Sequence, residues 1–213
     1  MKNKVSETVI KRLPKYHRYL EELIEAGEDR ISSQELSNLT GFTASQIRQD
    51  LNNFGGFGQQ GYGYKVPSLK EEIDNILGIP TVYKCVLIGA GHLGAVISLY
   101  KGFAKSGFEI IGIFDKDDKK VGTDIGTNTI RHTRDLADFL DQHPEVQVGI
   151  LTVPKEGAQE ITDILVDKKI KGIWNFAPTD LVTPEEVTVE SVRLNDSLLV
   201  LSYYLTERLE KEE

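Results

Sequence analysis

The sequence predicts an α/β protein with an N-terminal winged helix-turn-helix domain, a Rossmann-type parallel-sheet domain and a C-terminal helix that is expected to be domain-swapped. Three observations predict this organisation. Short helical patterns separated by a glycine turn occupy the first 54 residues, strand and helix patterns alternate after residue 80, and the last helix is apolar on almost every side. The expected domain boundaries are therefore 1–80, 81–194 and 195–213.

The length and composition are those of a globular protein that can bury a core. The 213 residues are 39% hydrophobic and 27% charged. No run of about 18 apolar residues and no apolar signal core occurs, so we expect a cytoplasmic protein without a membrane partner. The single cysteine, Cys85, falls within an apolar strand pattern, where a buried structural thiol is expected rather than a redox centre.

Charge is distributed unevenly along the chain. The formal net charge is −8, yet the first 20 residues carry six basic side chains against Glu7 alone. A basic N-terminal segment on an acidic body suits an anionic partner, although a solvated helix start would have the same composition. The candidate phosphate contacts are Lys11, Arg12 and Lys15.

Start and stop signals divide the N-terminal region into helices. The first helix begins near Pro14 and ends at Gly27. Ser32-Ser33-Gln34-Glu35 is a capping box for a second helix that ends at Gly41, and Thr43-Ala44-Ser45-Gln46 is a capping box for a third. Two short helices joined by a turn that contains glycine match helix-turn-helix geometry.

The third helix has a polar face that suits DNA bases. Its apolar stripe consists of Ile47, Leu51 and Phe54, which leaves the opposite side polar. Arginine can hold guanine with its forked guanidinium, and glutamine or asparagine can pair with adenine. An ordinary polar surface is the alternative interpretation. The candidate base-contacting residues are Ser45, Gln46, Arg48, Gln49 and Asn52.

Glycines and aromatic residues are interleaved immediately after that helix. Residues 55–66 contain five glycines, which favours a tight β-hairpin over a linker. After a helix-turn-helix such a hairpin would be a wing, with Gln60 or Tyr62 at its tip and Lys65 nearby. A helical pattern over 67–79 then leads to the second domain.

A glycine fingerprint opens the second domain. The apolar strand pattern 84–88 runs directly into Gly89-x-Gly91-x-x-Gly94, and a helical pattern over 95–105 follows. This is the strand-turn-helix context of a dinucleotide fingerprint, in which the helix N-terminus binds the pyrophosphate. A second strand ends at Asp115, 21 residues beyond Gly94, where a carboxylate can accept hydrogen bonds from the adenosine ribose.

Further strand and helix patterns complete a predicted parallel sheet with right-handed crossovers. Residues 146–152 and 172–176 are the next strands, with a helix after Pro154. Ligands of such sheets lie outside the carboxyl ends of the strands. The candidate cofactor-binding residues at those ends are Gly89, Gly91, His92, Leu93, Gly94, Asp115, Lys116, Thr152, Val153, Pro154, Asn175, Phe176 and Ala177.

The C-terminal helix is almost entirely apolar. Asn195 or Asp196 is its expected cap, and residues 198–205 carry leucine, valine and tyrosine on nearly every side. Such a helix must be buried nearly all round. A second subunit would bury it most simply, which favours a homodimer, and burial within its own domain is the alternative.

Five segments together resemble the Rex family of redox-sensing transcriptional repressors, and the resemblance covers essentially the whole chain. They are Arg48-Gln49-Asp50-Leu51 with Phe54-Gly55, Gly61-x-Gly63-Tyr64-x-Val66-Pro67, the glycine fingerprint, Leu151-Thr152-Val153-Pro154, and Gly172-Ile173-x-Asn175-Phe176-Ala177-Pro178. The resemblance implies a homodimer that binds double-stranded inverted-repeat operator DNA, that NADH releases from it, and in which NAD+ competes for the same site without releasing the DNA.

The resemblance also implies which residues carry the switch. Arg18 and Tyr100 match positions that couple the occupancy of the nicotinamide site, to which Tyr100 would also contribute, to the DNA-binding domain. Where the family usually places an acidic residue that reaches this network from the partner subunit, this chain has Arg193. Either the alignment shifts towards Asp196, or the switch is built differently here.

Other ligands and functions are less consistent with the sequence. A dehydrogenase needs a proton-transfer group beside the nicotinamide, and the four histidines are scattered with no Tyr-x-x-x-Lys motif, so we expect a protein that is not an enzyme. A CoA-binding domain is a further alternative, which Asp115 and the winged helix oppose. Asp115 also disfavours NADP, although Lys116 is adjacent. No cluster with metal-ligand spacing occurs, so no metal is expected.

Overall fold

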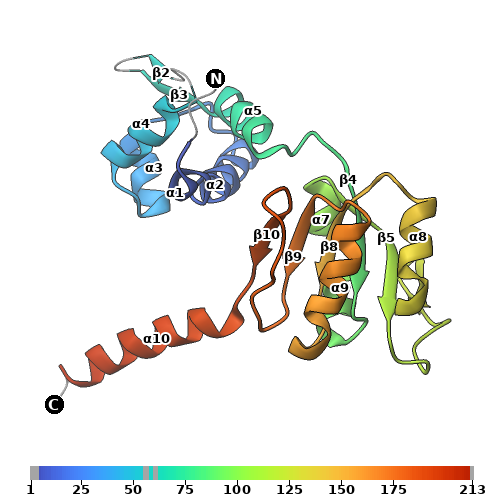
Figure 1. Cartoon of the computed structure of the whole chain (residues 1–213). Coiled ribbons are helices and arrows are strands. Elements are labelled where there is room, and N and C mark those ends of the chain that lie inside the picture. Colours follow the sequence, from blue (N-terminus) through green and yellow to red (C-terminus); the bar gives the residue numbers. More distant parts are fainter. Residues whose placement is uncertain (1–4, 55–57, 60–61, 212–213) are drawn as a thin grey trace. The chain divides into compact units, whose positions relative to one another are not determined.

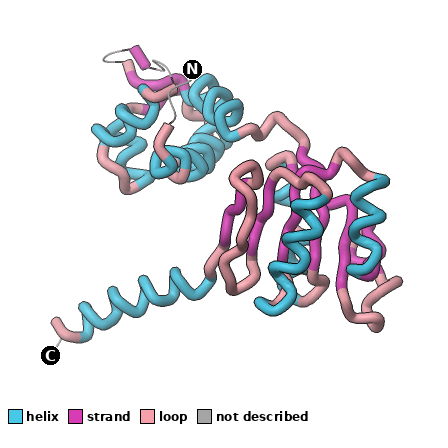
Figure 2. Tube along the Cα trace, viewed as in Figure 1, coloured by secondary structure: helices cyan, strands magenta, loops and turns pink. Residues whose placement is uncertain are grey.

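The computed structural model describes residues 5–54, 58–59 and 62–211. It divides into two compact units, Met1–Thr81 and Val82–Glu213, each with its own core (Figure 1). Figure 2 shows that helices dominate the first unit, whereas strands form the centre of the second.

The first unit is a helical domain with a small antiparallel sheet. The sheet order is β1-β3-β2. The helices are α1 (Glu7–Ile10), α2 (Leu13–Glu25), α3 (Ser33–Thr40), α4 (Ala44–Asn52) and α5 (Val66–Leu77), and the strands are β1 (Arg30–Ile31), β2 (Gly58–Gln59) and β3 (Gly63–Lys65).

The expected capping signals set the bounds of α3 and α4. The Ser32 hydroxyl accepts the Glu35 N–H at 3.1 Å, and the Glu35 carboxylate accepts the Ser32 N–H at 2.7 Å, so the first box is complete. Gly41 ends α3 with φ +73°, a conformation that glycine adopts at little cost. The Thr43 hydroxyl accepts the Gln46 N–H at the start of α4. The capping residues Ser32, Gly41 and Thr43 therefore fix where the two helices of the helix-turn-helix begin and where the first one ends.

Strands β2 and β3 form the expected wing hairpin. Gly58 pairs with Tyr64 and Gln59 with Gly63. A side chain on Gly63 would place its Cβ 2.6 Å from the Ile31 carbonyl oxygen, so glycine allows β3 to lie close to β1. Gln60, a predicted tip residue, lies outside the described residues.

The second unit is a doubly wound sheet of seven strands in the order β10-β9-β8-β4-β5-β7-β6. All its pairings are parallel except that of β6 with β7. The chain order reverses between β4 and β8, and ligands of such sheets bind at that switch point. The strands are β4 (Tyr83–Ile88), β5 (Phe108–Asp115), β6 (Asp124–Ile125), β7 (Asn128–His132), β8 (Val146–Leu151), β9 (Gly172–Asn175) and β10 (Thr188–Ser191).

Helices pack on both faces of this sheet. One core contains residues of α8 (Leu136–Gln142) and α9 (Lys155–Asp167) against β4, β5 and β8. The other contains Ile97 of α6 (His92–Leu99), with Phe103 of α7 (Lys101–Lys105) packed against it. Two-sided burial explains why the central strands are continuous apolar runs.

The structure differs from the expected elements in one helix and three strands of this unit. The single helix expected over 95–105 is two helices, because Tyr100 between them has extended backbone with ψ +106°. Strands β6, β7 and β10 lie where the sequence has no strand pattern, because at most one residue of each is buried.

The last helix, α10 (Leu194–Leu209), has no buried residue within the single chain. Nine of its large apolar side chains are between 50% and 69% exposed. The alternative of burial within its own domain is therefore wrong. Its N-cap is Arg193, with Asn195 and Asp196 in the first turn instead of at the cap.

Candidate nucleotide site and nucleic-acid interface

The glycine turn joins β4 to α6 with almost no free space. Gly89 has φ +105°, and a Cβ there would lie 2.6 Å from the Thr152 carbonyl oxygen. A Cβ on Gly94 would lie only 2.0 Å from the Gly89 carbonyl oxygen. Both positions therefore require glycine for the close packing of strand, turn and helix.

Gly91 differs from these two glycines. It caps α6 with φ −79°, and no atom lies within 4 Å of the position that its Cβ would occupy. The space above Gly91 is thus open, beside the first N–H groups of α6. Those groups have no partner within the helix and favour an anion.

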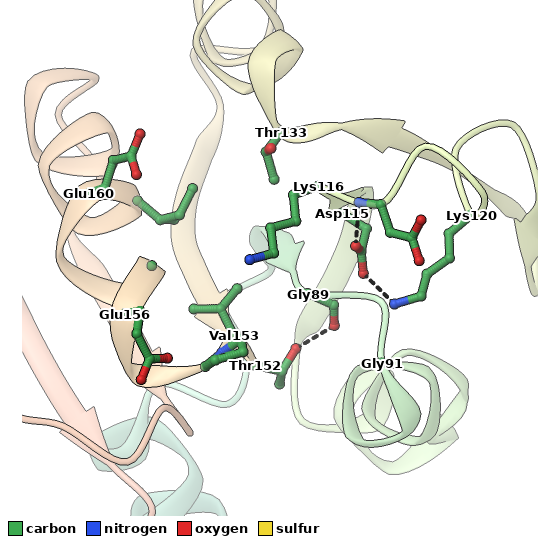
Figure 3. Close-up of a pocket in the computed structure, with 14 residues that line it drawn as sticks. Gly89, Gly91, Asp115, Lys116, Lys120, Thr133, Thr152, Val153, Glu156 and Glu160 are labelled. Atoms are coloured by element: carbon green, nitrogen blue, oxygen red, sulfur yellow. Dashed lines mark hydrogen bonds and ion pairs between the residues drawn. The ribbon is translucent and has the colours of Figure 1, made fainter.

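A cavity of about 660 Å³ opens at the carboxyl ends of β4, β5 and β8 (Figure 3). This is the edge at which the sheet order reverses. Seven predicted cofactor residues line the cavity: Gly89, Gly91, Asp115, Lys116, Thr152, Val153 and Pro154. It is also lined by residues that the sequence did not indicate, namely Asp117, Lys120, Thr133, Glu156, Gly157, Glu160 and Ile161.

Most of those further residues could have been predicted from their position in the sequence. Glu156, Gly157, Glu160 and Ile161 belong to the start of α9, which follows directly from the β8 end that the sequence did indicate. Thr133 follows β7, a strand without a sequence signal.

Asp115 is the most constrained charged group of the cavity. Its Oδ2 accepts the Ala90 N–H at 2.8 Å and the Lys120 ammonium at 2.9 Å, while Oδ1 accepts the Asp117 N–H at 2.9 Å. Burial acts to raise its pKa, but the Asp117 N–H, the Lys120 ammonium and the Ala90 N–H outweigh it, and the pKa is lowered. Asp115 is therefore an anion at neutral pH.

Thr152 joins the two strands on either side of the switch point. Its hydroxyl donates to the Gly89 carbonyl oxygen at 2.6 Å and lies 3.1 Å from that of Ile88. The hydroxyl thus holds the glycine turn against β8. Its contribution to the cavity is mainly to fix the shape of that turn.

Several predicted cofactor residues lie elsewhere. His92 and Leu93 are exposed in the first turn of α6, and Gly94 is buried behind them. Tyr100 is exposed and contacts the Phe103 ring edge-on. Phe176 is half-buried and contacts the Trp174 ring.

Asn175 and Ala177 do not have the surface contact that the sequence suggested. Both are fully buried. The Asn175 side chain accepts the Ala177 N–H at 2.9 Å and donates to the Thr179 carbonyl oxygen at 2.9 Å. Asn175 therefore stabilises the turn after β9, and direct contact of either residue with a cofactor stays a prediction.

The polar face of α4 is exposed as expected. Its five candidate residues, Ser45, Gln46, Arg48, Gln49 and Asn52, are all exposed, whereas Ile47 and Leu51 are buried. The Arg48 guanidinium donates to the Ser33 hydroxyl at 2.9 Å, which holds it beside the start of α3. Tyr62, in the wing, is 71% exposed.

The predicted phosphate contacts near the N-terminus fall into different environments. Lys11 is exposed and lies 2.7 Å from Glu7. Lys15 is half-buried, with its ammonium over the Phe42 ring.

Arg12 points into the domain instead of outwards. Its side chain is only 15% exposed and donates twice to the Asp50 carboxylate, at 2.6 Å each. The Tyr16 hydroxyl donates to the same carboxylate at 2.7 Å, and burial together with Asp50 raises the pKa of that phenol. This ion pair ties α2 to α4, and the phosphate contact of Arg12 stays a prediction.

The residues expected to couple the two units can each be described within its own unit. Arg18 is exposed on α2, with its guanidinium over the Tyr19 ring. Arg193 donates to the Ala177 carbonyl oxygen and to the Asp180 carboxylate, the latter at 2.8 Å. Its positive charge is thus paired beside the turn that Asn175 stabilises.

Metal-ligand clusters and membrane spans were considered only for residues 5–54, 58–59 and 62–211, which the structure describes. Neither a group of three potential metal ligands nor a helix long and apolar enough to cross a membrane occurs there.

Family models match both units. A model described as a putative DNA-binding protein N-terminus matches residues 4–52. A model described as a CoA binding domain matches residues 81–179.

Curated relatives match the chain over nearly its full length. The redox-sensing transcriptional repressor Rex of Clostridium acetobutylicum is 52% identical, covering 97% of this chain and 96% of the relative. That of Clostridium kluyveri is 54% identical, covering 97% of this chain and 98% of the relative.

Solved structures match over both units as well. RSP in complex with β-NAD+ and operator DNA is 50% identical with a TM-score of 0.91, covering 99% of this chain and 97% of that one. RSP with β-NADH is 47% identical with a TM-score of 0.90, covering 99% of each. RSP is described as a Rex-family repressor.

Proposed function

This chain belongs to the Rex family of redox-sensing transcriptional repressors, and we propose that it represses transcription by binding operator DNA and that NADH releases it. The observation that carries this is the full-length match to structures that contain operator DNA and both forms of the dinucleotide. Each unit of this chain offers a candidate site: the exposed polar face of α4 in the first, and the cavity at the carboxyl ends of β4, β5 and β8 in the second. We also propose that the protein acts in the cytoplasm, since a bacterial repressor acts where the DNA is.

The dinucleotide would lie across the switch point of the second unit. The open space above Gly91 at the start of α6 fits the pyrophosphate, with His92, Leu93 and Gly94 supplying N–H groups. Asp115 fits the adenosine ribose, because its anionic carboxylate lies at the end of β5. The nicotinamide half would extend past Thr152, Val153 and Pro154 towards β8.

The DNA would be bound by the first unit. Helix α4 presents Arg48, Gln49 and Asn52, whose side chains suit base edges in the major groove. Lys11 and Lys15 near the N-terminus and Tyr62 in the wing would contact the backbone of the duplex. We expect an inverted-repeat operator, since a homodimer joined through α10 would present two such units.

The redox switch requires contacts that differ between NADH and NAD+, because a ligand shifts an equilibrium only by its differential affinity. Arg18 and Tyr100, exposed in their own units, are the proposed coupling residues. Either Asp196 supplies the acidic group that the family usually has, or Arg193 stands in its place, where it pairs with the exposed Asp180 carboxylate. A change in the redox switch at Arg193 would still allow nucleotide binding, because Arg193 is not among the residues that line the cavity.

We propose that the protein is not an enzyme. A dehydrogenase would need a proton-transfer group beside the nicotinamide. Three of the four histidines contact carboxylates instead: His17 contacts Asp74, His132 contacts Asp118 and His143 contacts Glu145. None of these three is among the residues that line the cavity.

Coenzyme A is a second candidate ligand, because the family model that matches residues 81–179 is described as a CoA binding domain. Asp115 favours the dinucleotide. Its anionic carboxylate suits a free ribose hydroxyl and would repel the phosphorylated ribose of coenzyme A.

Fluorescence anisotropy of a labelled inverted-repeat duplex tests the function directly. The duplex is first bound to the protein at a fixed, stated salt concentration, because protein–DNA affinity depends strongly on salt. NADH, NAD+ and coenzyme A are then titrated separately. Release by NADH, with little release by the other two, is the expected result.

The other outcomes distinguish the alternatives. Equal release by NADH and NAD+ would contradict redox discrimination and implicate Arg193 in its loss. Release by coenzyme A alone would favour the second candidate ligand. Nucleotide binding without binding to the duplex would contradict the repressor function and lead to a search for substrates.

A further inference from the structure

An ion pair occupies the expected ribose end of the nucleotide cavity. The Lys120 ammonium lies 2.9 Å from the Asp115 carboxylate, and both residues line the cavity (Figure 3). The Lys120 side chain is 38% exposed, whereas that of Asp115 is 8% exposed. A cation with access to solvent thus lies beside the buried acid.

The two charges favour different ligands. An acidic residue at the end of the second strand accepts hydrogen bonds from a free ribose 2′-hydroxyl, while a nearby cation accommodates a 2′-phosphate. Most sites of this fold need only one of them. Here both are present at one place, and the lysine is paired with the acid.

The local backbone holds the lysine in this position. The Asp117 N–H donates to Asp115 Oδ1, and the Lys120 N–H donates to the Asp117 carbonyl oxygen, both at 2.9 Å. The resulting turn returns the chain so that Lys120 reaches the Asp115 carboxylate. Lys116, which lies next to Asp115 in sequence, lines the same cavity.

We propose that Asp115 selects the dinucleotide in two ways. It accepts the ribose hydroxyl of NAD(H), and it also holds Lys120 in an ion pair that keeps this lysine from binding the 2′-phosphate of NADP(H). Lys120 is thus a latent phosphate ligand, available once the acid is removed. The inference rests on the proposed binding of NADH by the second unit.

Removing the acid should therefore change the preference as well as weaken the site. With Asp115→Ser, the Lys120 ammonium loses its partner and Lys116 remains nearby, so the site becomes cationic. A charge-assisted hydrogen bond to phosphate would raise the affinity for NADPH about tenfold or more over the natural protein. The affinity for NADH should fall, because the hydroxyl acceptor is gone.

Two double variants test whether Lys120 causes the gain in NADPH affinity. Asp115→Ser with Lys120→Ala should lose the gain in NADPH affinity. Asp115→Ser with Lys119→Ala should keep it, since Lys119 is exposed and is not among the residues that line the cavity. Both second changes remove one positive charge from the same loop, so the overall charge is matched.

The measurement is a titration of each full-length variant with NADH and with NADPH, following nucleotide fluorescence at fixed salt. Thermal melting and operator binding without nucleotide check that each variant is folded. If Asp115→Ser fails to fold, Asp115→Asn also removes the charge while keeping the shape, and the same order of NADPH affinities is expected.

Two results would overturn the inference. One is a folded variant at Asp115 whose NADPH affinity does not exceed that of the natural protein, as would occur if Lys120 turned to Asp117. The other is an equal gain with and without Lys120. Failure of the natural protein to bind NADH would instead contradict the proposed function.

Discussion

At the scale of single residues, the structure separates basic side chains that look equivalent in sequence. Arg12 is committed to the Asp50 carboxylate, which is almost completely buried and also accepts the Tyr16 hydroxyl. Arg48 is exposed on α4, with Ser33 as its hydrogen-bond partner. Arg12 therefore fixes the position of α4, while Arg48 remains exposed on it, where we expect it to contact DNA.

Replacing Arg48 tests its predicted base contact. Arg48→Ala should weaken binding to the operator by about 1–3 kcal/mol and relax specificity, with little effect on random duplex DNA. Arg48→Lys should lose most of the same specificity, because an ammonium cannot form the forked contact to guanine. Equal losses on operator and random DNA, with recovery in the lysine variant, would show a phosphate contact instead.

Removing one partner of the buried pair should affect folding as well as DNA binding. Arg12→Ala leaves the Asp50 carboxylate buried with one partner fewer, which typically costs about 3–5 kcal/mol. Urea unfolding measures the loss, and Lys11→Ala is a control at the neighbouring exposed position. A change below about 0.5 kcal/mol for Arg12→Ala would contradict this structural role.

Asp115 should make the stability of the protein depend on acidity. Its pKa in the folded protein is below the ordinary 3.8. Its contribution to the free energy of unfolding is therefore fully present above pH 3.8 and is lost as the pH falls through the lower, folded-state pKa. The difference in unfolding free energy between the natural protein and Asp115→Asn should be constant from pH 7 to 5 and shrink below about pH 4. If the stability difference between the two proteins instead grew as the pH fell, the lowered pKa of Asp115 would be contradicted.

At the scale of elements, the strand-turn-helix motif has separate glycine positions for packing and for ligand access. Gly94 lies where any Cβ would collide with the Gly89 carbonyl oxygen, while Gly91 faces open space. One fingerprint thus contains a position that the fold requires to be glycine and a position that faces open space, where we expect the ligand.

Two alanine substitutions test this division. Gly94→Ala should lower stability by about 1–3 kcal/mol, because the extra methyl group overpacks the turn. Gly91→Ala should leave the melting temperature nearly unchanged yet weaken NADH and NAD+ alike, because its methyl group would occupy the space for the pyrophosphate. Thermal melting and nucleotide titration of both variants measure this. Unchanged nucleotide affinity for Gly91→Ala would remove the α6 N-terminus from the site.

The elements also differ in how well the sequence alone predicts them. Capped helices such as α3, and central strands buried on both faces such as β4, have strong local signals. Strand β10 does not, because it lies at the sheet edge with three of its four residues exposed. The same limit applies to the sites. The glycine turn and Asp115 follow from local spacing, whereas the inward position of Arg12 depends on Asp50, 38 residues away.

At the scale of the whole molecule, α10 presents an apolar surface that we expect a second subunit to cover. Its large apolar side chains are between 50% and 69% exposed in the single chain. Together they form an exposed apolar patch of a kind that usually marks an interaction surface. We therefore expect a homodimer whose joining element is α10.

Charged substitutions in α10 separate assembly from nucleotide binding. Leu201→Asp combined with Leu205→Asp should make the protein monomeric in sedimentation, because two carboxylates would be buried in an apolar interface. The monomer should still bind the adenosine half of NADH, since Gly91 and Asp115 belong to the same unit of the chain. It should lose most of its operator affinity, because a monomer contacts only one half-site.

Ser202→Asp with Thr206→Asp places the same charges on the more polar positions of the same helix and should retain more of the dimer. A double leucine variant that remained dimeric would show that another surface joins the subunits, and a monomer with full operator affinity would mean that one DNA-binding unit is enough.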